Sequence, residues 1–230
     1  PRIENKNTLL AEIPSQLPQH IEDKHVDYDY EGLITKMISQ EGPTISVADI
    51  DNDGDEDVFM GGSRGEPAKI LIHQTKGNLT LAFSQDVFRE DRAFEDTASA
   101  FVDVDGDGDM DLVVASGGNI PNNRLAPKNR IYINDGKGNF TKDGKTIPSL
   151  DNNVSIIAPF DYDNDSDQDL FIGSRSVPGI YGVNPEHLFL ENDGNGNFSD
   201  ITENKAFHLK NVGMVTDALW ADYDGDSKKD

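Results

Sequence analysis

Aspartates at alternate positions are the chemically distinctive feature of this sequence. The run "DVDGDGDMDLVV" at 103–114 places five aspartates on alternate positions and then becomes wholly apolar. Carboxylates crowded this closely repel one another and raise one another's pKa unless a cation lies among them. Calcium takes six to eight oxygen ligands, and a D-x-D-x-D-G loop wraps one with positions 1, 3 and 5. The run therefore predicts a calcium loop that leads directly into a buried strand.

The same loop occurs four times, and its first aspartates lie 54, 58 and 61 residues apart. In each copy the predicted ligands are the side chains at positions 1, 3, 5 and 9 and the backbone carbonyl at position 7. These loop positions are Asp49, Asp51, Asp53, Asp55 and Asp57, then Asp103, Asp105, Asp107, Asp109 and Asp111, then Asp161, Asp163, Asp165, Asp167 and Asp169, and finally Asp222, Asp224, Asp226, Lys228 and Asp230. About four calcium sites are predicted.

Position 6 of the loop needs a sharp bend. Gly54 and Gly108 supply it in the first two loops, whereas Ser166 and Ser227 stand there in the third and fourth. Serine is strained in the conformation that glycine adopts easily, so the last two sites are predicted to be weaker. An EF-hand is excluded because position 12 lies in an apolar run instead of being a bidentate glutamate. Magnesium prefers water ligands, so a cage of protein oxygens favours calcium; a solvated acidic turn without metal is the alternative.

Short apolar runs and turns repeat together with the loops. Each loop separates two apolar runs, and a second pair is separated by a turn such as "NDGKGNF" at 134–140 or "NDGNGNF" at 192–198. Asn-Asp-Gly between strand-like runs predicts a hairpin, because these residues tolerate positive φ. Each period therefore predicts four short strands, A to D. Four-stranded units at this period are typical of an all-β fold, the β-propeller, whereas a β-sandwich would not repeat one turn in register.

The repeat also sets the expected boundaries. Residues 1–42 are interpreted as a lead-in segment that supplies an edge strand, and residues 43–230 as propeller blades. The predicted blades, about four, are 43–97, 98–153, 154–211 and an incomplete 212–230. Because the chain begins at Pro1 and ends inside the fourth loop, it is interpreted as part of a longer protein. The stretch "VDYDYEG" at 26–32 has two aspartates and no correctly placed glycine, so we expect no metal there.

Composition excludes several partners. The chain has 43 acidic and 20 basic residues, a formal charge of −23, and no cysteine. Nucleic acids and anionic membrane surfaces are therefore poor partners. Disulfides and thiolate metal sites are excluded, and the absence of a long apolar run predicts no transmembrane segment.

The aspartate loops and their flanking strands resemble the FG-GAP/VCBS repeat family, from about residue 43 to the C-terminus. The phrases "RIYINDGKGNFT" (130–141) and "NVGMVTDALWADYDGD" (211–226) resemble most the bacterial branch that carries ASPIC/UnbV-type modules in cartilage-acidic-protein-like chains. The resemblance implies integrin-α-like calcium-binding propeller blades and a secreted or surface-anchored protein. In bacteria it implies a lipoprotein that accompanies an outer-membrane uptake system. It implies no catalytic residue. Ser166, Ser227 and Lys228 depart from the family's pattern.

Partners are expected on the face opposite the calcium loops, because the B–C loops emerge there. Two of these loops, 116–130 and 174–187, are long, and long loops in a compact repeat are often functional. They offer a mixture expected of a glycan- or protein-binding surface, namely Asn122, Arg124, Arg130, Arg175 and Tyr181. The alternative is that these loops only pack against neighbouring blades.

The remaining candidates have ordinary structural interpretations. Arg64 and Arg175 follow strand B and are expected to neutralise acidic surface more than to bind an anion. The histidines form no ligand pair, and His73 and His187 are interpreted as packing or surface residues. Trp220, two residues before the fourth loop, is expected to pack in the core.

The sequence as a whole predicts a calcium-stabilised extracellular or cell-surface module that binds or scaffolds a glycan or protein and is not an enzyme. One version of this role is a lipid-anchored accessory subunit of an outer-membrane transporter complex. The alternative is a glycan-acting lyase or hydrolase. A lyase would need a base near an arginine on the loop face, and no such cluster is readable in the sequence.

Overall fold

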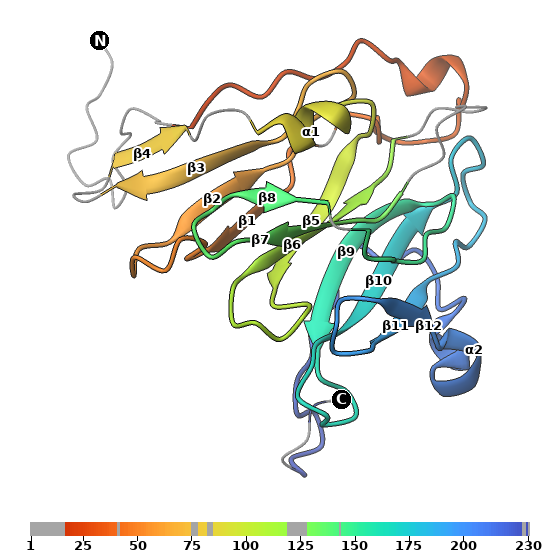
Figure 1. The fold of residues 1–230 in the computed structure, drawn as a ribbon. Coiled ribbons are helices and arrows are strands. Elements are labelled where there is room, and N and C mark those ends of the chain that lie inside the picture. Colours follow the sequence, from red (N-terminus) through yellow and green to blue (C-terminus); the bar gives the residue numbers. More distant parts are fainter. Residues whose placement is uncertain are drawn as a thin grey trace, which may run out of the picture.

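Three antiparallel four-stranded sheets form the framework of the protein (Figure 1). The computed structural model describes residues 17–40, 42–74, 78–81, 85–118, 128–142, 144–226 and 229, with only the backbone of 74 and 78–81. The strands are β1 (Ile45–Ala48), β2 (Asp57–Met60), β3 (Lys69–Gln74) and β4 (Asn78–Leu81); β5 (Asp96–Val102), β6 (Asp111–Ser116), β7 (Arg130–Asn134) and β8 (Phe140–Thr141); and β9 (Asn153–Phe160), β10 (Asp169–Ser176), β11 (Leu188–Asn192) and β12 (Phe198–Asp200).

Within each sheet the strand order follows the sequence. Every predicted loop of the first three periods joins the first strand of a sheet to its second, and every Asn-Gly turn joins the third to the fourth. The predicted architecture of propeller blades is therefore confirmed for these three periods, hereafter the first, second and third blades. The three described sheets do not close into a ring.

The first strands of the blades lie side by side, on the inner edge of each sheet. Hydroxyl groups connect them: the Ser99 Oγ on β5 lies 2.9 Å from Thr44 Oγ1 and 2.6 Å from Ser46 Oγ, beside and on β1. Farther along, β9 follows β5 and Ser155 Oγ donates to the Val215 carbonyl over 2.7 Å. Small polar residues at this edge let the strands approach closely.

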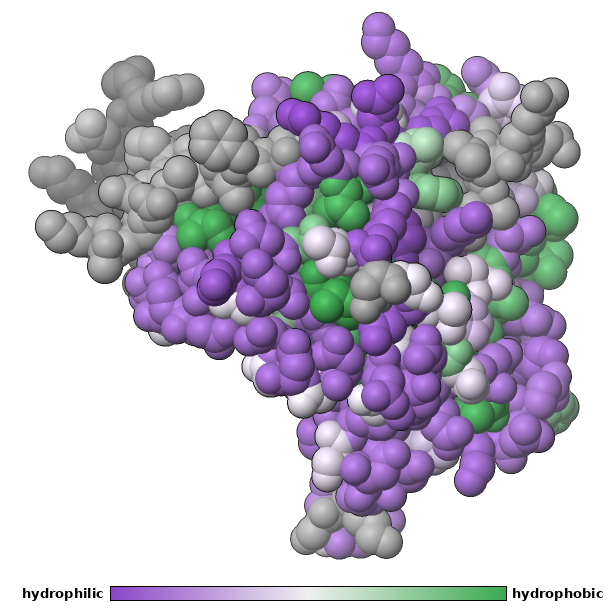
Figure 2. Space-filling view, in the orientation of Figure 1, coloured by the Kyte–Doolittle hydropathy of each residue, from purple (hydrophilic) through white to green (hydrophobic). Residues whose placement is uncertain are grey.

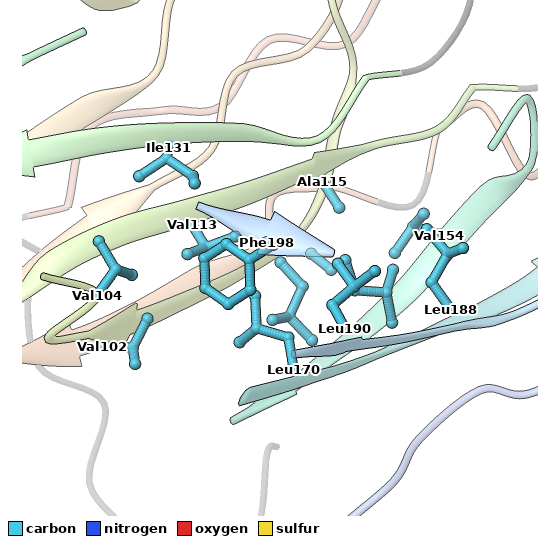
Figure 3. Close-up of a cluster of buried hydrophobic side chains, with 13 residues drawn as sticks. Val102, Val104, Val113, Ala115, Ile131, Val154, Leu170, Leu188, Leu190 and Phe198 are labelled. Atoms are coloured by element: carbon cyan, nitrogen blue, oxygen red, sulfur yellow. The ribbon is translucent and has the colours of Figure 1, made fainter. Parts of the chain in front are cut away.

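Apolar side chains fill the spaces between the blades. Phe59, Ile70 and Phe88, the last from α1 (Asp86–Glu90), meet Leu112 and Tyr132 of the second blade. The second and third blades enclose another cluster, shown in Figure 3, whose labelled members are Val102, Val104, Val113, Ala115, Ile131, Val154, Leu170, Leu188, Leu190 and Phe198. All six residues of β6 are buried because both faces of its sheet are covered. The outer face drawn in Figure 2 is mostly hydrophilic.

Residues 201–220 cover the face of the third sheet that points away from the second blade. This segment contains α2 (Thr202–Lys205), η2 (Phe207–Leu209) and an irregular stretch in which no strand is assigned. Trp220 stacks on Phe160 with ring centroids 4.9 Å apart, and its Nε1 donates to the Ala158 carbonyl over 3.2 Å. Trp220 therefore packs against the core as the sequence predicted.

The lead-in segment crosses the end of the blades that lies opposite the aspartate loops (Figure 1). Residues 17–40 contain η1 (Asp27–Asp29) and no strand, so the expected edge strand is not found in this described part. The reason is local: buried Asp27 accepts hydrogen bonds from Ser39 N (3.0 Å) and Ser39 Oγ (2.6 Å), which folds the segment on itself. Ser63 Oγ donates to the Ile21 carbonyl and ties the segment to the first blade.

Candidate metal centres

The first three aspartate loops share one hydrogen-bonded wrap. In the second loop, Asp103 at position 1 accepts the backbone N–H groups of Gly106 (2.8 Å) and Gly108 (3.0 Å). Asp107 at position 5 accepts the N–H of Asp109 over 2.9 Å. The corresponding aspartates of the first and third loops accept the N–H groups of positions 6 and 7 in the same way. The wrap curls the chain around the carboxylates, as a cation-binding loop requires.

Two positions of the wrap have left-handed backbone. Position 6 has φ of 92° at Gly54, 94° at Gly108 and 83° at Ser166, which places the serine in the strained conformation expected from the sequence. Position 4 is also left-handed, with φ of 60° at Asn52 and 65° at Asn164. Sequence reasoning missed this second bend, although position 4 is Asn or Gly in all four loops, the residues that tolerate such φ values.

Position 9 has a structural task beside its predicted role as a ligand. Asp111 is fully buried, and its carboxylate accepts the N–H of Val104 (3.0 Å) and that of Asn134 (2.8 Å). Asp57 and Asp169 make the equivalent pairs of bonds in their own blades. Position 9 therefore fastens each loop to the third strand of its own sheet. Each oxygen retains a lone pair that a cation could use.

The side chains at position 7 face the C–D turns. Asp109 Oδ1 accepts a hydrogen bond of 3.0 Å from Asn52 Nδ2, and Asp55 Oδ2 lies 3.9 Å from His73 Nδ1. A Cβ on Gly136 would lie 2.4 Å from Asp109 Oδ2, so any other residue there would displace the Asp109 side chain, and the φ of 69° at Gly136 also favours glycine.

Four groups of carboxylates bring ligand atoms within 4.8 Å of one another. The groups are Asp49, Asp51 and Asp53; Asp103, Asp105 and Asp111; Asp161, Asp163 and Asp169; and Asp222, Asp224 and Asp226. The first three are partly buried and the fourth is exposed. Lys228 and Asp230 lie outside the described residues. No such group is found within the described part of the lead-in segment.

The groups have the electrostatics of a cation site. Asp51 Oδ1 and Asp105 Oδ1 are buried and have no hydrogen-bond donor among the described residues. Burial, followed by the neighbouring carboxylates, raises the pKa of both side chains. Burial likewise raises the pKa of Asp111 to about 7 and that of Asp169 to about 6. A hard cation would satisfy these oxygens, and an all-oxygen ligand set suits calcium or magnesium rather than a soft metal.

The C–D turns of the second and third blades also hold the loop of the preceding blade. Asn134 Nδ2 donates to the Ile50 carbonyl in the first loop over 2.8 Å, and Asn192 Nδ2 donates to the Val104 carbonyl in the second over 2.9 Å. The Gly138 N–H adds a bond of 3.0 Å to Ile50. This inter-blade contact was not predicted, although both turns begin with asparagine and the degenerate turn of the first blade begins with histidine. Ordering a loop therefore orders the junction between two blades.

Comparison with family models agrees with this construction. The model of the FG-GAP-like repeat matches residues 49–114 and, in a second copy, residues 103–172. The chain belongs to this family. Each FG-GAP match runs from one aspartate loop to the strand after the next loop, so the matched unit spans two blades. Comparison with curated proteins gives no match. The resemblance to the ASPIC/UnbV-associated branch stays a prediction.

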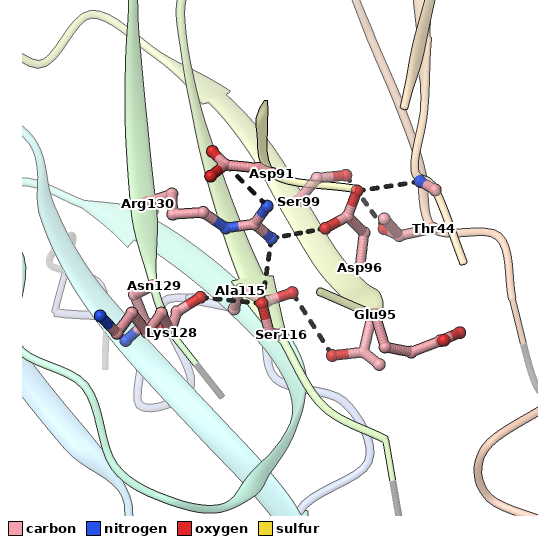
Figure 4. A network of polar contacts seen from close by, with 12 residues as sticks. Thr44, Asp91, Glu95, Asp96, Ser99, Ala115, Ser116, Lys128, Asn129 and Arg130 are labelled. Atoms are coloured by element: carbon pink, nitrogen blue, oxygen red, sulfur yellow. Dashed lines mark hydrogen bonds and ion pairs between the residues drawn. The ribbon is translucent and has the colours of Figure 1, made fainter. Parts of the chain in front are cut away.

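The opposite face of these FG-GAP blades differs from what the sequence suggested. Arg130, expected on a binding loop, is buried, and its Nη2 lies 2.5 Å from Asp96 Oδ1 and donates to Ser116 Oγ (3.0 Å), as Figure 4 shows. Asp96 also accepts the N–H of Gly62 in the first blade over 2.9 Å. Arg130 therefore neutralises a buried carboxylate that joins two blades. Arg130 is unavailable to a partner, so the prediction that it belongs to a partner-binding surface is wrong.

The other residues that the sequence singled out on this face are in part engaged in contacts within the chain. Arg64 pairs with Asp23 of the lead-in segment over 2.5 Å, so it neutralises the chain's own acidic surface as expected. His187 is buried; its Nδ1 accepts the Ser174 N–H and its Nε2 lies 2.9 Å from the Gly213 carbonyl, which confirms a packing role. Asn122 and Arg124 lie outside the described residues. Within the described residues no helix is long and apolar enough to cross a membrane.

Proposed function

We propose that this FG-GAP chain is a calcium-stabilised binding module whose blades are fixed by metal on one face and meet a partner on the other. The observation that carries the proposal is the pair of bonds from Asn134 and Asn192 to the preceding loops. Because these bonds link the first and second loops to the next blade, an ion that orders either loop also fixes the angle between the two blades. About four calcium ions are proposed, one for each acidic group.

Calcium acts as a folding ligand in this proposal. Its binding free energy adds to the stability of the folded chain because the wrap does not exist in the unfolded state. Micromolar or weaker affinity is enough where calcium is about millimolar, as outside cells. The location proposed is therefore extracellular or on a bacterial cell surface. A lipid anchor and association with an outer-membrane uptake system are the finer version, supported by the family resemblance.

A partner, glycan or protein, is proposed to meet the face that carries the B–C loops. Rigid blades hold these loops in their binding conformation before the partner arrives, which lowers the entropic cost of association. The chain's charge of −23 disfavours nucleic acids and anionic membranes. The proposed role requires no catalysis.

One observation favours a second candidate, a glycan-acting enzyme. Glu95 and Arg175 line the same cavity on the opposite face, which is the combination of base and arginine that a lyase needs. Burial raises the pKa of Glu95 to about 8, so the ionised form that acts as a general base is the minor form at neutral pH and becomes the main form above pH 8. Turnover assays with acidic and neutral polysaccharides test this candidate. Cleavage lost in Glu95→Gln would favour it over pure binding.

The calcium proposal is tested with one loop variant and one matched control. Asp105→Asn removes a carboxylate from the second loop, and Asp217→Asn changes an exposed aspartate outside the loops. Calcium titrated into the full chain should bind at one site fewer in Asp105→Asn and at the unchanged number in Asp217→Asn. Equal stoichiometry in both variants, or no uptake at millimolar calcium, would overturn the proposal.

A further inference from the structure

A polar cavity of about 160 Å³ lies at the inner ends of the blades, on the face opposite the aspartate loops. Its walls come from all three blades and from the lead-in segment. The residues with polar side chains that the argument uses are Thr44, Glu95, Thr97, Asn153, Ser155 and Arg175. Neither the family match nor the calcium proposal gives this cavity a task.

Two buried groups in its walls have unused hydrogen-bonding capacity. Asn153 is 1% exposed; its Nδ2 donates to Ser176 Oγ over 2.7 Å, while its Oδ1 has no donor among the described residues. Glu95 is 7% exposed and accepts the Arg64 N–H over 2.9 Å. Burial raises the pKa of Glu95 to about 8, so at neutral pH this carboxyl holds a proton that it can donate. Buried polar groups normally have partners, so such a wall suits a ligand rich in hydroxyl groups.

Charge decides which class of hydroxyl-rich ligand fits. The chain carries −23, and Glu22 and Asp23 are close enough to Glu95 to raise its pKa further. An anionic ligand would meet this field with Arg175 as the one arginine or lysine that lines this cavity and Lys36 as the one further lysine that lines the adjoining cavity. A neutral ligand avoids the repulsion and still uses the guanidinium as a hydrogen-bond donor.

A second cavity of about 180 Å³ adjoins the first and shares Ile38, Arg175 and Thr216 with it. Its wall includes Tyr181, which is 45% exposed and offers an apolar ring with a polar end. An amphipathic ring of this kind suits the apolar face of a sugar. The two cavities together form one groove with hydrogen-bonding groups at one end and an aromatic ring at the other.

We propose that this groove binds a neutral oligosaccharide, with one sugar residue in the cavity of Glu95 and Asn153 and the next against Tyr181. The inference rests on the proposed function as a binding module and names its ligand class. Arg175, between the two cavities, donates to hydroxyl groups of both sugar residues.

The test is calorimetric titration of the full chain, saturated with calcium, with neutral gluco-, manno- and xylo-oligosaccharides and with oligogalacturonate as the acidic probe. At least one neutral series should bind. Tyr181→Ala and Arg175→Met should each weaken that binding about tenfold or more, the loss that about 1.4 kcal/mol produces. The matched controls are Tyr28→Ala, an exposed tyrosine outside the groove, and Arg89→Met, an exposed arginine on α1; both should bind unchanged. Unchanged melting temperatures would show that all four variants fold.

The outcomes separate this inference from the proposed function. The proposal that the groove binds a sugar would be overturned if no neutral oligosaccharide binds. It would also be overturned if Tyr181→Ala and Arg175→Met bind as well as their controls. Binding of oligogalacturonate alone would overturn the ligand class. In each of these cases normal calcium uptake by the same samples would leave the calcium-stabilised module intact. Its ligand would then be an acidic glycan if oligogalacturonate binds, and a protein partner if no oligosaccharide binds.

Discussion

The two faces of the blades are built in different ways. On the face of the aspartate loops, one wrap recurs in three blades with the same donors and acceptors, and asparagines of successive turns hold successive loops. On the opposite face, the side-chain contacts described at the junctions differ from one to the next: the first junction is held by Asp96 and buried Arg130, whereas the groove lies beside Arg175. Because the same contacts recur on the face of the aspartate loops, that face has one structural task. The contacts of the opposite face vary, and this variation allows it to be specific for one partner.

Removing Arg130 should produce the largest effect, and it tests whether the opposite face contributes to stability without calcium. Arg130→Met leaves the Asp96 carboxylate buried and unpaired, so the free energy of unfolding should fall by about 3–5 kcal/mol. Urea unfolding with calcium and with a chelator measures it, and the loss should be similar in both. Arg89→Met, at an exposed site, should stay within about 0.5 kcal/mol. If the free energy of unfolding falls only when calcium is present, the opposite face does not stabilise the protein independently of the metal.

Acid titration of Glu95 should give the next effect. A glutamate in the unfolded chain titrates near 4.5, whereas burial raises the pKa of Glu95 to about 8. The folded state therefore keeps a proton that the unfolded state loses, and stability falls as pH rises from 4.5 through 8, by at most about 1.4 kcal/mol per pH unit. Unfolding at saturating calcium from pH 5 to 8.5 should show this fall. Glu95→Gln should flatten the curve, and an equally steep curve in the variant would contradict the assignment.

Removing one inter-blade asparagine should produce a smaller loss on the metal face. Asn134→Ala leaves the Ile50 and Met110 carbonyls without this donor, and should lower the free energy of unfolding by about 1–3 kcal/mol. Asn195→Ala, in the exposed part of the equivalent turn, is the control and should change little. Thermal unfolding with and without calcium measures both. If the two variants behave alike, the turns do not connect the blades.

The smallest effect concerns the left-handed position 6. Ser166→Gly removes the strain of a serine at φ 83° and should stabilise the protein by about 1 kcal/mol and tighten calcium binding in the third loop. Gly108→Ser makes the reverse change in the second loop and should destabilise by a similar amount. Calcium titrations of the two variants compare them directly. Changes of the same sign would show that position 6 does not control the loops.

Most of the structure on the face of the aspartate loops could be predicted from the sequence because each motif is repeated. The strands, the Asn-Gly turns and the grouping of the carboxylates could be read from the spacing alone. The left-handed Asn52 and the inter-blade Asn134 were equally readable, since their residue types recur, but their meaning depends on which turn lies against which loop. That depends on how the blades pack, which the spacing within one blade does not contain.

The opposite face could not be read in this way. Arg130 appeared as an accessible loop residue because its partner Asp96 lies 34 positions away in the sequence. Asp27 appeared as part of a failed aspartate loop, and only its contacts with Ser39 explain why the lead-in segment turns instead of forming a strand. Glu95 carries no motif. Contacts made once, between distant parts of the chain, leave no pattern in a single sequence.

Calcium titration of the full chain, followed by calorimetry and by thermal unfolding of the same samples, tests the central claim most directly. The account predicts a stoichiometry near four and a melting temperature that rises with calcium, since a ligand at about 100 times its Kd stabilises by about 2.7 kcal/mol for each site. A melting temperature that does not change between chelator and millimolar calcium would contradict it.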